Sequence, residues 1–234
     1  MPLKDVVKLA KGCGAMVCVD GVGYVPHRLV DVKDLEVDFY VFSAYKTFGP
    51  HLGVMYGKAE LLKKIPRWNH FFFAEDAVPE KFELGSFCYE AAAGLLGLEK
   101  YYRALGKRFG GPVREAFTDV YADIAAHEAK LTKTLLTYLS SKPRVSVVGG
   151  ADPRRLDERL PVVSFLVDET DPEELVQEVD KGRVGIRWGH FYAVRLLNAL
   201  DLLQYKGVVR VSLAHYNTEA EIARLKDVLD PLLS

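Results

Sequence analysis

Hydrophobic positions follow two different patterns in the first sixty residues of the chain. Between Leu3 and Lys11 they recur at helical spacing, and the following GCG tripeptide predicts the end of that helix. After it come short continuous apolar runs, which are typical of buried strands. The predicted strands are residues 15–20, 39–43 and 52–57. A short helical turn is expected at 30–38. Apolar strands joined by helical connections predict an α/β fold whose sheet has helices on both faces.

Helical patterns then dominate, and a second alternation of strands and helices follows. Helices are expected at 89–106 and 112–142. The second alternation predicts strands at 145–150, 161–168, 184–190 and 208–216, and helices at 171–182, 192–204 and 218–233. Asp171 before Pro172, and Thr218 with Glu221, are helix-start signals. We therefore expect three parts: a sheet-containing domain over 1–110, a long bridging helix over 111–144 and a small α+β domain over 145–234.

Composition narrows the class of protein. The 234 residues are 49% hydrophobic and 27% charged, with a formal net charge of −1, which is typical of a folded globular protein. Without a basic excess, neither a nucleic acid nor an anionic membrane is the expected main partner. No cluster of His, Cys and carboxylate residues has metal-ligand spacing, so no metal site is expected.

Three cysteines, Cys13, Cys18 and Cys88, form no CxxC pair and no even framework. This usage favours a reducing, cytoplasmic setting. Each is expected to be a small buried hydrophobe. A second apolar group, Trp68 with the HFFF run at 70–73, is expected to lie either in the core or at a subunit interface.

Asp20 and Lys46 each follow a predicted strand, and ligands bind at the carboxyl edge of open α/β sheets. The pair could be a plain salt bridge, and Lys46 could be a solvated loop residue. Pyridoxal phosphate (PLP) offers another interpretation, because it needs a lysine to hold it and a carboxylate beside its pyridinium nitrogen. A lysine held against a core can act as a nucleophile or base.

Four segments turn this alternative into a family resemblance. They are VDGVGYVPHRLVDV, DFYVFSAYKTFGPHLGVMYGK, FELGSFCYEAAAGLLGLEKY and GVVRVSLAHYNTEAEIARL, in this order. Together they resemble class V aminotransferases of fold type I, the PLP-dependent group that includes cysteine desulfurases and selenocysteine lyases. The resemblance implies part of a large PLP-binding domain with a mostly parallel sheet, followed by the small α+β domain. It also implies an amino-acid substrate and a dimer, formed with a second copy or with a full-length paralogue.

The same resemblance assigns roles to individual residues. It implies that Lys46 is the Schiff-base lysine, which also moves the proton at the substrate's Cα, and that Asp20 is the pyridinium partner. Ser43 and Tyr45 match the pair that bonds the phosphate. Ser86 matches a hydroxyl that reaches the phosphate of the neighbouring subunit. The remaining candidates, for the substrate carboxylate, are Arg210 and, less directly, Arg187.

Three departures from the family pattern shape the expected chemistry. Tyr192, in GHFYA, stands where desulfurases carry a nucleophilic cysteine, so desulfuration through a persulfide is not expected. Gly23 stands where relatives place a glutamine or histidine that bonds the cofactor's phenolic oxygen. Full-length relatives also carry about two-fifths more protein ahead of this point, including a phosphate-cradling loop, so the chain is expected to be N-terminally truncated.

Two functions from different classes follow. The first is an amino-acid enzyme that performs transamination, Cβ elimination or racemisation. The second is a non-catalytic remnant that at most dimerises with a full-length paralogue. Uptake of PLP on Lys46 discriminates between them.

Overall fold

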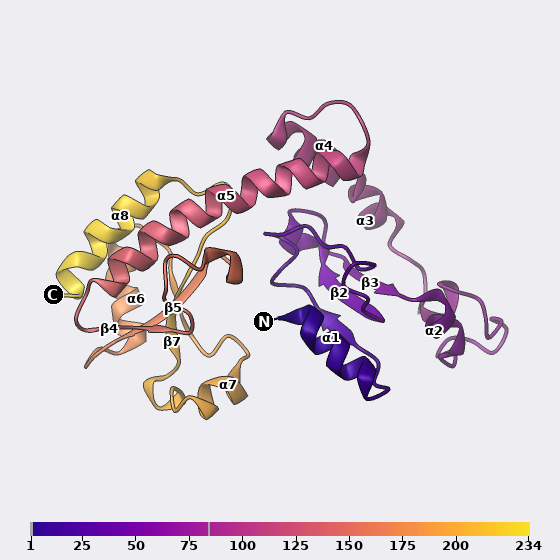
Figure 1. Ribbon diagram of the computed structural model, residues 1–234, viewed down its shortest axis with the longest axis horizontal. Helices are drawn as coiled ribbons and strands as arrows, with labels where there is room; N and C mark the ends of the chain where they lie inside the picture. Colours follow the sequence, from indigo (N-terminus) through magenta and orange to yellow (C-terminus); the bar gives the residue numbers. More distant parts are fainter. Residues whose placement is uncertain (1, 84) are drawn as a thin grey trace. The chain divides into compact units, whose positions relative to one another are not determined.

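A computed structural model describes residues 2–83 and 85–234, which form two compact units, Met1–Asp123 and Ile124–Ser234 (Figure 1). The long helix α5 (Val113–Ser140) contributes residues to both. The domain boundaries expected near residues 110 and 144 stay a prediction. No helix in the described ranges is long and apolar enough to cross a membrane.

Unit 1 is built on a three-stranded sheet in the order β1-β2-β3. Its strands are β1 (Cys18–Asp20), β2 (Phe39–Ser43) and β3 (Gly53–Gly57). β1 runs parallel to β2, and β3 runs antiparallel to it. Helix α1 (Leu3–Gly12) adds Val7 to a small core with Val17, Val37 and Tyr40. The three predicted strands and the first helix are present, although β1 is shorter than the predicted 15–20, and the α/β class is confirmed.

The amino-terminal end of the β1–β2 ladder is fixed by Asp38. Its carboxylate is buried, accepts a hydrogen bond from the Val17 amide (2.8 Å), and pairs with Lys58 Nζ (2.7 Å). The Lys58 hydrogen bond, and then the Val17 N–H, hold the pKa of Asp38 below its usual value. One side chain therefore ties together the starts of two strands and the end of a third.

A fully buried lysine organises the segment after α2 (Ala59–Lys64). The Lys81 Nζ donates to the carbonyls of Lys63 (3.1 Å), Ile65 (2.7 Å) and Glu75 (2.7 Å). Three acceptors match the three donors of an ammonium group. The aromatic residues of this segment take the opposite position, since Trp68, Phe71 and Phe72 are exposed in the described chain. They are therefore not core residues of unit 1, while an interface role stays a prediction.

Helices α3 (Tyr89–Gly94) and α4 (Leu96–Gly106) complete unit 1 with the first part of α5. The predicted helix over 89–106 is thus present, with a break at Leu95. In α4 the side chain of Tyr102 is buried, and Tyr121 of α5 packs on it, with ring centroids 5.2 Å apart. These residues bury apolar area that the small sheet alone does not provide.

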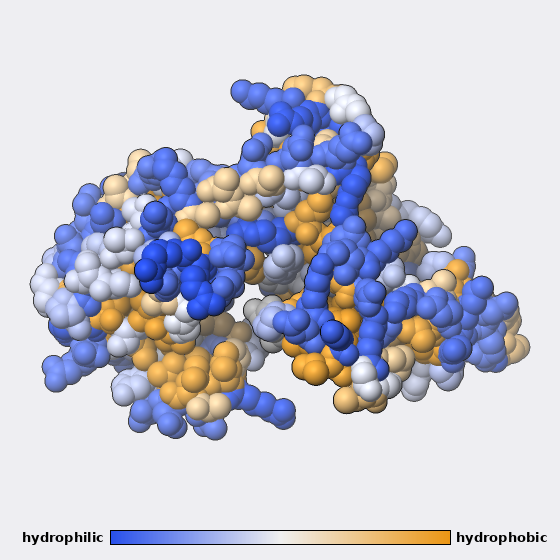
Figure 2. Space-filling model, viewed as in Figure 1, coloured by the Kyte–Doolittle hydropathy of each residue, from blue (hydrophilic) through white to orange (hydrophobic). Residues whose placement is uncertain are grey.

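Unit 2 is an antiparallel sheet in the order β4-β5-β7-β6 with helices packed on it. The strands are β4 (Val145–Val148), β5 (Val162–Val167), β6 (Arg187–Gly189) and β7 (Val208–Ser212), and the helices are α6 (Pro172–Lys181), α7 (Val194–Ala199) and α8 (Glu219–Leu229). Leucines of α5 meet α6, α8 and the strands in one core. The predicted cap on α6 and capping box on α8 are confirmed. Figure 2 shows apolar side chains gathered at α7, where Val194, Leu196 and Leu200 are exposed.

One local expectation is wrong. All three cysteines are free and exposed rather than buried. For Cys18 the reason is that β1 is an edge strand of the described sheet. The short helical turn expected at 30–38 is present, since residues 32–36 form hydrogen-bonded turns in which the Leu35 amide donates to the Asp31 carbonyl (3.0 Å). The Asp31 carboxylate also accepts hydrogen bonds from the amides of Lys33 and Asp34, which favours this local turn.

Candidate functional site

Asp20 and Lys46 lie at one edge of the unit 1 sheet. Asp20 is the last residue of β1 and is in register with Val41 of the parallel strand β2. β2 ends two residues later at Ser43, and Lys46 lies in the 3₁₀ turn η1 (Ala44–Thr47) that follows directly. Because the strands are parallel, their carboxyl ends meet at the same edge, where ligands bind in open α/β sheets. The structure therefore places both candidates as the sequence predicts.

Asp20 is exposed, and only one of its carboxylate oxygens accepts a hydrogen bond from the described chain. Oδ1 accepts a hydrogen bond from the Val22 amide (3.0 Å), and the carboxylate has no ion pair among the described residues. The next residue must be glycine, because a Cβ on Gly21 would lie 2.0 Å from the hydroxyl oxygen of Tyr40. Burial, together with the charge of Asp20, raises the pKa of Tyr40 to about 12. A neutral phenol thus supports the loop below the carboxylate.

Lys46 is also exposed, while the residues around it are fixed. Ala44 and Thr47 are buried, and the Thr47 hydroxyl donates to the Ala44 carbonyl (2.8 Å). Phe48 ends the turn in the left-handed region, with φ of 67°. Within residues 2–83 and 85–234, Lys46 Nζ makes no hydrogen bond and no ion pair. The amine extends from a hydrogen-bonded turn with buried neighbours, and the salt-bridge alternative does not hold in the described chain.

The predicted phosphate-binding residues are divided. Ser43 directly precedes the turn and Tyr45 lies within it, where the Tyr45 ring packs on His51 with centroids 4.6 Å apart. Neither hydroxyl makes a hydrogen bond within the described part of the chain. Ser86 lies on an exposed loop before α3, and no described hydrogen bond joins it to Asp20 or Lys46. The first two hydroxyls therefore belong to the edge that carries Lys46, and the role of Ser86 stays a prediction.

In unit 2 the two candidate arginines face each other across a strand pair. Arg187 of β6 is in register with Arg210 of β7. Like charges directly opposite each other are unfavourable unless an anion or another group compensates them. Arg187 is exposed and donates to its neighbour's carbonyl at Ile186 (2.7 Å). Arg210 is half-buried, and its Nε has no hydrogen-bond partner in the described residues. Burial lowers the pKa of the Arg210 guanidinium.

The contact between Phe191 and Arg210 was not predicted from the sequence. The Phe191 ring centroid lies 3.7 Å from the central guanidinium carbon of Arg210, a favourable cation–π arrangement. Phe191 and Tyr192 both have positive φ (50° and 62°), which is uncommon for aromatic residues. Tyr192 is 98% exposed. This loop therefore presents a phenol to solvent and stacks the preceding ring on the arginine.

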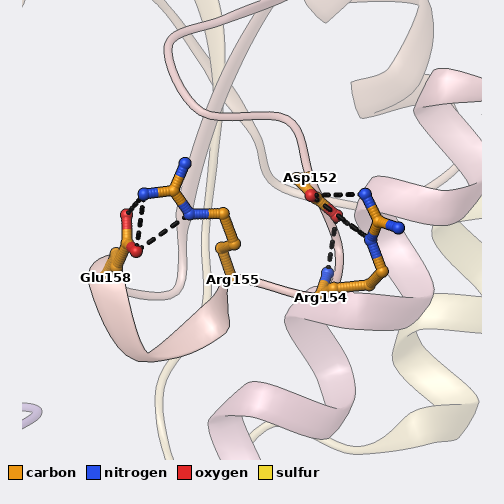
Figure 3. A network of polar contacts seen from close by, with 4 residues as sticks. All are labelled: Asp152, Arg154, Arg155 and Glu158. Atoms are coloured by element: carbon orange, nitrogen blue, oxygen red, sulfur yellow. Dashed lines mark hydrogen bonds and ion pairs between the residues drawn. The ribbon is translucent and has the colours of Figure 1, made fainter.

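The exposed loop after β4 of unit 2 carries two surface ion pairs. Figure 3 shows Asp152 paired with Arg154, and Arg155 paired with Glu158, on the exposed loop after β4. The Arg154 side chain, and then its backbone N–H, lower the pKa of Asp152 to about 2. Exposed pairs of this kind contribute little to stability.

Comparison with known proteins settles the family. The family model for class V aminotransferases matches residues 1–225. The chain belongs to this family. Class V aminotransferases, with the cysteine desulfurases among them, are PLP-dependent, typically dimeric and act on amino acids.

Individual relatives of class V aminotransferase type match nearly the whole chain. It is 38% identical to the aminotransferase-like protein FGM3 of Gibberella zeae over 94% of the chain and 52% of the relative. It is 32% identical to a cysteine desulfurase of Pectobacterium atrosepticum over 96% of the chain and 52% of the relative. The chain spans about half the length of these curated relatives.

Solved structures give the same fold. The apo structure of a cysteine desulfurase from Thermococcus onnurineus is 26% identical to the chain, with a TM-score of 0.79 over 99% of the chain and 56% of that structure. The partial class V aminotransferase fold expected from the four sequence segments is thus confirmed.

Proposed function

We propose that the carboxyl edge of β1 and β2 is a PLP site and that the chain is part of an enzyme acting on an amino acid. The observation that carries the proposal is the placement of Asp20 and Lys46 at one sheet edge, where both are exposed and neither pairs with a charged group in residues 2–83 and 85–234. The donor set fits the cofactor, because an amine, a carboxylate with one oxygen left over and two hydroxyls match its carbonyl, pyridine nitrogen and phosphate.

Each residue has a distinct task in this proposal. Bound PLP supplies an electron sink for the carbon skeleton of the amino acid. Lys46 holds the group through Nζ and moves a proton at the substrate's Cα. Asp20 accepts a hydrogen bond from the pyridine N–H, and its negative charge keeps that nitrogen protonated. Ser43 and Tyr45 donate to the phosphate, and Ser86 is proposed to do so in a dimer partner.

The arginines of unit 2 are proposed to bind the substrate carboxylate. Arg210 is the better candidate, because a planar guanidinium stacked on Phe191 has its orientation fixed before a carboxylate arrives. Arg187 is its cross-strand neighbour and adds a second positive charge. A carboxylate placed between them would compensate the like-charge pair.

The proposed reaction class is transamination, Cβ elimination or racemisation. Tyr192 stands at the position of the desulfurase cysteine, and a phenol does not accept sulfur as a persulfide. Persulfide-type desulfuration is therefore not proposed. A cytoplasmic setting and a dimer, formed by two copies or with a full-length paralogue, complete the proposal.

One observation favours a second candidate, a partner of a full-length paralogue without turnover of its own. Gly23 stands where relatives bond the cofactor, and a Cβ built there would meet no atom within 4 Å. The position has room for a side chain but supplies no hydrogen bond, which weakens the hold on a bound cofactor.

A reductive trapping experiment tests the first candidate. Purified protein is mixed with equimolar PLP, treated with sodium borohydride and digested, and labelled lysines are located by mass spectrometry. We expect one label per chain on Lys46, with visible absorbance before reduction. Lys46→Ala should lose both, and the matched variant of an exposed lysine on α2, Lys64→Ala, should keep both. Labels spread over surface lysines without preference for Lys46 would contradict the proposal.

A further inference from the structure

Two buried phenols in unit 1 touch both loops that carry the candidate chemistry. Tyr102 is 1% exposed and Tyr121 is 6% exposed, and the Tyr121 hydroxyl donates to the Tyr102 oxygen at 3.0 Å. They come from α4 and α5, and their rings stack with centroids 5.2 Å apart. Neither residue belongs to the site described above.

On one side the pair reaches the turn that carries Lys46. The Tyr102 hydroxyl donates to the carbonyl of Thr47, the residue after Lys46, at 3.4 Å. The same helix also packs on the end of the turn, since a Cβ on Gly49 would lie 3.2 Å from Leu98 of α4. Helix α4 therefore fixes where the turn ends and, through it, where the amine begins.

On the other side the pair reaches the loop that follows Asp20. The Tyr121 hydroxyl lies 3.1 Å from the Val25 carbonyl, to which it can donate. The amide of Val25 in turn donates to the carbonyl of Gly21 (3.0 Å), the residue directly after Asp20. A single hydrogen-bonded turn thus connects the phenol with the carboxylate.

The two phenols share one hydrogen-bond network. They carry two hydroxyl protons, and among the described residues three contacts compete for them: the Thr47 carbonyl, the Val25 carbonyl and the phenol–phenol bond. Linked hydrogen bonds of this kind polarise one another in a buried setting. Removing either hydroxyl changes the bonding available to the other.

This connection matters because Asp20 and Lys46 do not hold each other in place. Asp20 and Lys46 form no ion pair that could fix their separation in the described chain, while a cofactor held between an amine and a carboxylate needs both placed within about 0.5 Å. We propose that Tyr102 and Tyr121 are a positioning pair that sets the separation of Lys46 and Asp20 and thereby tunes the affinity of Lys46 for PLP. This inference rests on the proposed function for its cofactor, but not for its connection of the two loops.

Isosteric variants test the pair, and the chain offers a matched control. Tyr102→Phe and Tyr121→Phe remove only hydroxyls. Tyr138→Phe does the same further along α5, where the phenol donates to Asp230 Oδ1 (3.0 Å) and lies 3.3 Å from Lys226 O in unit 2. All three delete a hydroxyl of a buried tyrosine, but only the first two act on the candidate site.

The first readout uses no cofactor. Amide hydrogen exchange is measured on the full chain by mass spectrometry for peptides covering 21–28 and 44–49. We expect about tenfold faster exchange in both loops for either site variant, and unchanged exchange there for Tyr138→Phe. Acceleration confined to the loop that directly loses its hydroxyl contact, or to neither loop, would overturn the pair as a connection.

The second readout is PLP binding to Lys46, which is measured by visible absorbance and by borohydride trapping. We expect about tenfold weaker binding for each single variant, about the same for the double variant because the network is shared, and wild-type binding for Tyr138→Phe. Wild-type affinity in the site variants would overturn the positioning role. Failure of the wild-type chain itself to bind PLP would overturn the proposed function and the affinity role with it, while the exchange result would still decide whether the pair connects the loops.

Discussion

The two ends of the β1–β2 ladder each carry an aspartate and a lysine, and they use them in opposite ways. At the amino-terminal end, Asp38 is buried and pairs with Lys58 at 2.7 Å, with the Val17 amide as a second donor. At the carboxyl end, Asp20 and Lys46 are exposed and form no ion pair in the described residues. The same two residue types close one end of the ladder and leave the other end open.

The difference lies in what the backbone arranges around each pair. Lys58 follows β3 directly opposite Asp38, and its amide donates to the Asp38 carbonyl, so both side chains extend from one antiparallel pair. Lys46 instead lies in a 3₁₀ turn that begins after β2 has ended, and Asp20 ends the neighbouring parallel strand. An acid and a lysine near strand ends therefore become a structural pair only when the ladder itself brings them together.

The largest expected effect comes from breaking the closed end. Asp38→Asn should lower the free energy of unfolding of unit 1 by about 2 kcal/mol, because Lys58 and the Val17 amide lose a charged acceptor in a buried position. The matched change at the open end, Asp20→Asn, should cost less than about 0.5 kcal/mol. Native-state amide exchange of β1 and β2 measures both, and equal losses at the two ends would contradict the comparison.

A double-mutant cycle sharpens the same contrast. The coupling energy of Asp38→Asn with Lys58→Met should be about 1.5 kcal/mol, as is typical of a hydrogen bond between charged groups that are partly shielded from water. The cycle of Asp20→Asn with Lys46→Met should give a coupling close to zero. A coupling at the open end as large as that at the closed end would show that Asp20 and Lys46 do pair in solution.

Acid should remove the contribution of the closed end. The Lys58 hydrogen bond and the Val17 N–H lower the folded-state pKa of Asp38, so its stabilisation is complete above the ordinary aspartate pKa of about 3.9. It is lost as the pH falls through the lowered folded value. The stability difference between wild type and Asp38→Asn should therefore be constant from about pH 7 to pH 5 and shrink below about pH 4, which denaturant titrations at each pH would detect. A difference that grew on acidification would contradict this sign.

The smallest expected effect on stability is that of the residue with the largest expected chemical role. Lys46→Ala should change the free energy of unfolding by less than about 0.5 kcal/mol, because the side chain is exposed and has no described partner. The same variant is expected to lose the PLP label entirely. Denaturant unfolding measures the first quantity, and a loss above about 1 kcal/mol would reveal a structural role for this lysine.

Much of the fold could be predicted because its signals are local. The hydrophobic period predicts α1 and α5 closely, and the Thr218–Glu221 capping box appears as the spacing requires. Exposure was harder to predict. Free cysteines are usually buried, but Cys18 lies on an edge strand and is exposed. Lys81 is fully buried, although no sequence pattern distinguishes it from a surface lysine.

The candidate site also has a part that could be predicted from the sequence and a part that could not. Strand ends are visible in the sequence, so the placement of Asp20, Ser43 and Lys46 at one edge was predictable. The stacking of Phe191 on Arg210 was not, because it depends on a positive φ at a non-glycine residue and on the position of a separate strand. The four-segment resemblance identified the family, while the contact that orients the arginine is visible only in the structure.

The buried amine of Lys81 can report local opening of the chain, because it becomes reactive only when its three carbonyl partners move away. An amine-directed acylating reagent should modify Lys46 in the native protein, while Lys81 is fully buried with its nitrogen bonded to three carbonyls. Modification of Lys81 then measures how often residues 63–81 come apart, and the ratio of the two labels compares surface reactivity with conformational opening in a single digest. No added dye or engineered cysteine is needed for that measurement.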